Sequence, residues 1–75
     1  MQDAKMDINT MEFMVWVIEI VSAQFFDGDK TSAYTALVNC GIWDKYIKTY
    51  DTTHALGKEF ILEEIGGHIR AGGVL

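Results

Sequence analysis

The sequence predicts an all-α protein, a compact bundle of about four helices in a single domain over residues 1–75. Apolar residues recur at helical spacing along most of the chain. The chain contains no proline, so no residue of that kind forces a helix to break. Its longest apolar segment, 11–26, is longer than an ordinary β-strand. These three observations favour helices that pack on one another.

The first predicted helix covers 9–26, and we expect it to be the central hub of the bundle. Between residues 11 and 26, twelve of 16 residues are apolar. At about 100° per residue, the polar residues Glu12, Glu19 and Ser22 form a thin strip. Such a helix has to be covered almost all round, by other helices or by a partner. Its valines and isoleucines also suit a strand, but its length favours a helix.

Asn9 is the predicted N-cap of this helix, because Glu12 follows three residues later as in a capping box. An earlier start, capped by Asp3 or Asp7, is the alternative. We expect residues 1–8 to fray, since chain ends are rarely held by packing.

A second helix is predicted over 30–40, after a turn at 27–29. Asp29 is its expected N-cap. Gly41 follows at the position where a glycine commonly ends a helix. The apolar face of this helix consists of Ala33, Tyr34, Leu37 and Val38.

A short third helix is predicted over 43–51, then a loop or corner up to Gly57, and a last helix over 58–69. The third helix has an aromatic and apolar face of Trp43, Tyr46, Ile47 and Tyr50. The last helix repeats apolar residues at Ile61, Ile65 and Ile69. Gly66-Gly67 disfavours helix by about 1 kcal/mol per residue. We therefore expect fraying from there and a loose tail over 71–75.

The composition narrows the classes of function. Eleven acidic and six basic residues give a net charge of −5, which disfavours a nucleic-acid binder and favours a basic or neutral protein partner. Cys40, the only cysteine, allows no internal disulfide or cysteine zinc site. The N-terminus lacks the features of a signal peptide, and the apolar segment is shorter than the ~20 residues of a membrane span. We expect a cytoplasmic protein with no membrane contact.

No group of residues points to a catalytic site, a metal or a cofactor. Asp51 and His54 have the spacing of an orienting carboxylate and a general base. Nothing selects a nucleophile among Cys40, Thr52 and Thr53, and capping of a helix end explains these side chains better. Glu64 and His68 have the spacing of paired metal ligands, but one pair makes no site. We therefore expect no enzyme.

Residues on the apolar helix and the aromatic face are the candidates for contact with a partner. Glu19 lies among apolar residues, where an unpaired buried charge is costly. It is either on a solvent strip with Glu12 or an acidic contact at the edge of an interface. The predicted partner-binding residues are Glu12, Trp16, Glu19, Trp43 and Tyr50, and the predicted corner consists of Asp51, His54 and Gly57.

The segment 30–51 suggests an alternative, since two helices joined by a short turn resemble a helix-turn-helix unit. Its candidate recognition helix presents Lys45, Lys48 and Thr49. Asp44 and Asp51 flank the lysines, which weakens their attraction for phosphate.

A set of short motifs carries a resemblance: Phe13 to Glu19, Gly41-Ile42, Tyr50-Asp51, His54 with Gly57, and Glu59 to Ile65. In this order, over about residues 9–70, the chain resembles a bacterial family known as domain of unknown function thirty-seven ninety-one. Gly66-Gly67 departs from that family, which has polar helix formers there. Some members stand beside ADP-ribosyltransferase-like proteins in two-gene modules. The resemblance implies a cytoplasmic, helical protein with an antitoxin-like or accessory binding role, and it supplies no catalytic residue.

The sequence thus predicts a non-enzymatic protein-binding module. Its partner is a co-encoded toxin-type enzyme or a further copy of the chain. The alternative is the helix-turn-helix nucleic-acid binder, and a small hydrolase or transferase that uses Asp51 and His54 ranks last.

Overall fold

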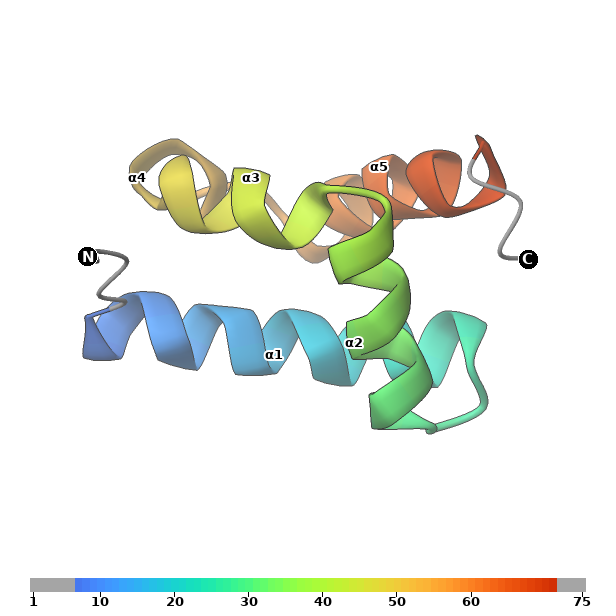
Figure 1. Ribbon diagram of the computed structural model, residues 1–75. Helices are drawn as coiled ribbons and strands as arrows, with labels where there is room; N and C mark the ends of the chain where they lie inside the picture. Colours follow the sequence, from blue (N-terminus) through green and yellow to red (C-terminus); the bar gives the residue numbers. More distant parts are fainter. Residues whose placement is uncertain (1–6, 72–75) are drawn as a thin grey trace.

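The computed structural model describes residues 7–71, which form five helices and no strand (Figure 1). The prediction of an all-α bundle is therefore confirmed. The predictions for residues 1–6 and 72–75 lie outside the described residues. The helices are α1 (Ile8–Phe25), α2 (Lys30–Asn39), α3 (Ile42–Lys48), α4 (Tyr50–Thr53) and α5 (Lys58–Ala71).

The bundle has five helices rather than four because the predicted helix 43–51 is divided at Thr49. This residue has φ −110° and ψ 26°, outside the helical range, and it ends α3. Its hydroxyl donates a hydrogen bond to the carbonyl of Lys45 at 2.7 Å. A β-branched residue whose hydroxyl bonds back to the preceding turn competes with helix continuation. The chain then restarts as the single turn α4.

Helix α1 begins one residue earlier than predicted. The carboxylate of Asp7 accepts a hydrogen bond from the backbone N–H of Thr10 at 2.8 Å, and this bond lowers the pKa of Asp7. Asp7 is therefore the N-cap, and Asn9 lies inside the helix. The prediction of Asn9 as the cap is therefore wrong, and the alternative start capped by Asp7 is confirmed. At the other end Phe26 follows the helix as its C-cap.

Helix α1 packs against α2, α3 and α5, which agrees with its predicted role as the hub. Figure 1 shows it along one side of the molecule, with α3, α4 and α5 in a layer opposite and α2 crossing between them. The hub is thus covered on one side and not all round. The buried core consists of Met14, Val17, Val21, Ala33, Ala36, Leu37, Ile42, Tyr46, Ile61, Ile65 and Ile69.

The start and end of α2 agree with the predicted capping. The carboxylate of Asp29 accepts from the backbone N–H of Ser32 at 3.1 Å, and Gly41 has the left-handed φ of 85°. The predicted face is only partly correct, because Tyr34 and Val38 are exposed. Ala33 and Leu37 are buried as predicted, and the small residue Ala36 is buried with them. Short side chains on this face let α2 approach its neighbours closely.

Helix α5 continues through Gly66-Gly67 to Ala71, so the predicted fraying at the glycines is wrong. A Cβ atom on Gly66 would lie 3.0 Å from Cζ of Phe25 and 3.1 Å from Nη2 of Arg70. The glycine therefore makes room for the Phe25 ring at the end of α1. Tertiary packing outweighs the weak helix propensity at this position.

Candidate partner-binding surface

One face of α1 points away from the rest of the molecule. Ile8, Met11 and Val15 are 69%, 49% and 50% exposed, and they lie on successive turns of the helix. Glu12 and Glu19 share this face. The five residues Ile8, Met11, Glu12, Val15 and Glu19 are called the α1 stripe below. Half of the six large hydrophobic side chains that are exposed between residues 7 and 71 belong to it.

The two carboxylates of the α1 stripe have different surroundings. Glu19 lies 3.9 Å from the ammonium of Lys30, with both side chains more than half exposed, so the pair contributes little. Glu12 forms no ion pair within residues 7–71. Ser22, predicted to lie on the same polar strip, is buried. Its hydroxyl donates to the carbonyl of Glu19, and its own carbonyl accepts from the loop that follows the helix.

A shallow apolar depression, the α1–α2 depression, lies on one side of the α1 stripe. It has a volume of about 370 Å³. Apolar side chains of both helices form most of its wall, and the Glu19–Lys30 pair lies at its edge. The lining residues are Val15, Ile18, Glu19, Lys30, Thr31 and Tyr34.

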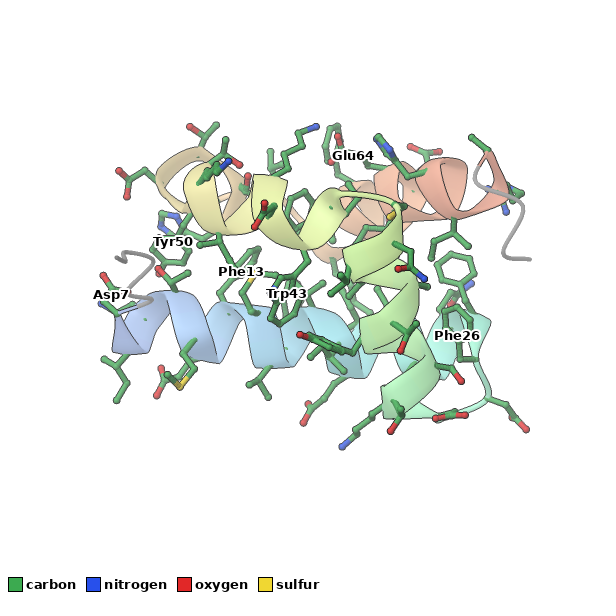
Figure 2. All side chains as sticks on the ribbon, viewed as in Figure 1. Asp7, Phe13, Phe26, Trp43, Tyr50 and Glu64 are labelled. Carbon is green, nitrogen blue, oxygen red and sulfur yellow. The ribbon has the colours of Figure 1, made fainter. Side chains whose placement is uncertain are left out.

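A second depression, the α1–α4 depression, lies between α1 and α4 and has a volume of about 400 Å³. Its wall is mainly aromatic. The ring centroids of Phe13 and Tyr50 are 5.6 Å apart in an edge-to-face arrangement, and Figure 2 shows both side chains between the two helices. The His54 ring stacks on Tyr50 at 4.5 Å. The lining residues are Asn9, Glu12, Phe13, Trp16, Tyr50 and His54.

The structure therefore brings together three of the five predicted partner-binding residues, Glu12, Trp16 and Tyr50, in one depression. Glu19 lines the other depression. Trp43 is half-buried and lines neither depression, but its ring centroid lies 4.9 Å from that of Tyr34, which lines the α1–α2 depression.

The predicted corner, Asp51 to Gly57, covers the end of α4 and the turn that follows, where side chains cap the helix and form local hydrogen bonds. Nδ1 of His54 lies 2.7 Å from the carbonyl oxygen of Tyr50, so the ring caps the end of α4. No hydrogen bond or ion pair joins Asp51 to His54 in the part of the chain that the structure describes. The hydroxyl of Thr53 bonds instead to that of Thr49 at 2.8 Å. Gly57 precedes α5, and its carbonyl accepts from the N–H of Ile61.

A cluster that the sequence did not indicate ties α3 to α5. The buried hydroxyl of Tyr46 donates to Oε1 of Glu64 at 2.6 Å, and the ammonium of Lys45 reaches Oε2 at 3.0 Å. The hydrogen bond from Tyr46 is the main cause that lowers the pKa of Glu64, while burial raises the pKa of Tyr46. Both oxygens of Glu64 are thus engaged, which disfavours its use with His68 as a metal ligand.

The exposed apolar residues Ile8, Met11 and Val15 were missed as candidates. The excess of apolar residues around α1 was the available indication, because a chain of this size cannot cover every side of such a helix. Within residues 7–71, no helix combines the length and the hydrophobicity that a membrane crossing requires.

Comparisons with protein-family models, with curated proteins and with solved structures find no match to this chain. The resemblance to the domain of unknown function therefore stays a prediction.

Proposed function

We propose that the protein is a non-enzymatic protein-binding module whose contact face is the α1 stripe. The observation that carries the proposal is the exposure of Ile8, Met11 and Val15 on one face of a helix. Their spacing of three and then four residues is that of the apolar anchors with which a helix binds a partner's groove. Exposed apolar groups that lie together mark interaction sites more often than scattered ones do.

The two depressions extend this face on either side. The α1–α2 depression offers Val15, Ile18 and Tyr34 to an apolar side chain of the partner. Shallow hollows beside an exposed helix give a binding surface a shape that a partner can complement. The partner that we propose is a co-encoded toxin-type enzyme, which the complex would neutralise in the cytoplasm. A further copy of the chain is the alternative occupant.

Site-specific photocrosslinking in the native host tests this proposal. A benzophenone amino acid replaces Val15 in the stripe or, as the matched control, Glu63, which is exposed on the outer face of α5. We expect position 15 to form one dominant adduct whose mass identifies the neighbouring gene product or a second copy. Position 63 should form none. Absence of an adduct at position 15, or equal adducts at both positions, would contradict the proposal.

The helix-turn-helix alternative is tested with the same purified protein. Lys45, one of its three candidate contacts, already forms an ion pair with Glu64. The other two candidates, Lys48 and Thr49, are exposed. We expect no retention of duplex DNA at low salt, where phosphate contacts are strongest. Retention that is lost on Lys48→Glu would favour the nucleic-acid function instead.

A further inference from the structure

We propose that the α1–α4 depression is a socket for an arginine side chain of the protein partner. The inference rests on the proposed function and adds the chemistry of the partner. Two properties of the depression carry it, namely its aromatic wall and the carboxylate of Glu12, which forms no ion pair with any residue from 7 to 71.

The aromatic wall suits a planar cation. Trp16 is half-buried, lies 5.8 Å from Phe13 between ring centroids, and lines the depression. A tryptophan face is the best aromatic acceptor for a cation, and a guanidinium also stacks flat on it. The neighbouring Tyr50 ring packs edge-to-face with Phe13 and is stacked on the His54 ring. The wall is therefore preorganised, so binding orders few side chains.

The carboxylate of Glu12 gives the socket its charge. It is exposed beside the aromatic wall, and no cationic group between residues 7 and 71 pairs with it. An arginine that stacks on Trp16 presents N–H groups at its edge, and a carboxylate accepts two of them in parallel. A lysine ammonium is compact and offers no plane to stack, so arginine fits this pair of groups better.

The α1–α2 depression provides the contrast. Its carboxylate, Glu19, already faces Lys30 at 3.9 Å, and its wall contains aliphatic side chains and one tyrosine. A cation would meet Lys30 there. The two depressions therefore differ in chemistry. One is apolar with its own ion pair, and the other is aromatic with a carboxylate that no described cationic group pairs with.

Charge also decides between a basic partner and a second copy. The chain has a net charge of −5, and the α1 stripe holds Glu12 and Glu19. In a symmetric pair the same surface of each copy meets at the interface. Pairing along this stripe would bring carboxylates of both copies together, which costs free energy. A basic surface of another protein meets no such repulsion.

Nuclear magnetic resonance of the full chain tests the socket, with N-acetyl-arginine amide as the probe. The two tryptophans, Trp16 and Trp43, supply an internal control, because only Trp16 lines the depression. At constant ionic strength, we expect the probe to shift the indole N–H signal of Trp16 in a saturable manner and to leave Trp43 unchanged. N-acetyl-lysine amide should bind more weakly, and the uncharged N-acetyl-norleucine amide should produce no saturable shift.

A matched pair of variants tests whether the carboxylate of Glu12 binds the arginine probe. Glu12→Gln should weaken the binding of the arginine probe by roughly twofold to fivefold, the effect of one exposed ion pair. Glu63→Gln removes the same charge at an exposed position of α5, outside the α1 stripe and both depressions, and should leave the binding unchanged. Equal losses in the two variants, or equal shifts of the two tryptophans, would overturn the socket.

The outcome separates this inference from the proposed function. A crosslink at position 15 without a selective shift of Trp16 would overturn the arginine socket alone. A selective shift of Trp16 without any crosslink would support the socket and contradict the stripe as a partner-binding face. A crosslinked adduct that contains only two copies of the chain would overturn the basic partner.

Discussion

The two longest helices, α1 and α5, use their apolar residues differently. In α5 the three isoleucines Ile61, Ile65 and Ile69 are fully buried, and Phe60 is its only large exposed hydrophobic residue up to Ala71. Helix α1 also buries an inner row, which contains Met14, Val17 and Val21. It differs because its outer face carries a second apolar row, Ile8, Met11 and Val15.

This difference separates residues that fold the chain from residues that need another explanation. The packing of the described helices accounts for nearly all of the apolar residues in α5. In α1 it accounts for the buried row and for the partly buried apolar residues beside it, but not for Ile8, Met11 and Val15, which no described helix covers. A free energy of folding gained from burial cannot explain the outer row. That row is therefore the part of the molecule where contact with a partner is to be sought.

The largest expected effect is at the buried face of α5. Ile65→Ala should lower the free energy of unfolding by about 2–5 kcal/mol, because Ile65 is fully buried and the change leaves a cavity. Phe60→Ala on the same helix is the control and should change stability by about 0.5 kcal/mol or less, because half of its surface is already exposed. Urea unfolding followed by circular dichroism measures both. Similar losses would mean that the outer face of α5 is buried in solution.

An intermediate effect is expected at the contact between α3 and α5. Tyr46→Phe removes the 2.6 Å hydrogen bond to Glu64 and should cost about 1.5–3 kcal/mol at neutral pH, the range for a bond to a charged group. Tyr50→Phe is the control, since no hydrogen bond of its hydroxyl is formed within residues 7–71. It should change stability much less.

The cost of Tyr46→Phe should also depend on pH. In the folded protein the pKa of Glu64 lies below its ordinary value of 4.5, chiefly because Tyr46 donates to the carboxylate. A lowered pKa means that the stabilisation is fully present above pH 4.5 and is lost as the pH falls through the folded value. The difference in stability between wild type and variant should therefore shrink between pH 6 and pH 3. A difference that stays constant would show that the lost contact is independent of the charge on Glu64.

The sequence predicted the elements that follow from local rules. Helical periodicity placed the three isoleucines of α5 correctly, and the short side chain of Asp29 marked the start of α2. Gly41 was recognised at the end of α2 because helices commonly end at a residue in the left-handed conformation, which glycine adopts easily. Each of these predictions depends on residues within one or two turns, which a sequence shows directly.

Features set by contacts between distant residues were missed. From its helix propensity, Gly66 is expected to break the helix. The structure explains the glycine, because the Phe25 ring packs where a side chain would otherwise lie. The Tyr46–Glu64 bond joins residues 18 positions apart. Of the candidate surface, the separate residues Glu12, Trp16 and Tyr50 were named from the sequence. Their convergence in one depression depends on how α4 lies against α1, which no local pattern reports.

The smallest expected effect is at the exposed apolar row of α1. Met11→Gln combined with Val15→Gln should leave the free energy of unfolding within about 1 kcal/mol of wild type, because each change at an exposed position contributes roughly 0.5 kcal/mol or less. Glutamine is a better helix former than valine, which offsets part of any lost contact. Urea unfolding and light scattering of the same samples measure stability and particle mass. A loss above about 2 kcal/mol together with a lower mass would show that the α1 stripe is the buried core of an oligomer, because only burial makes an apolar side chain that costly to replace.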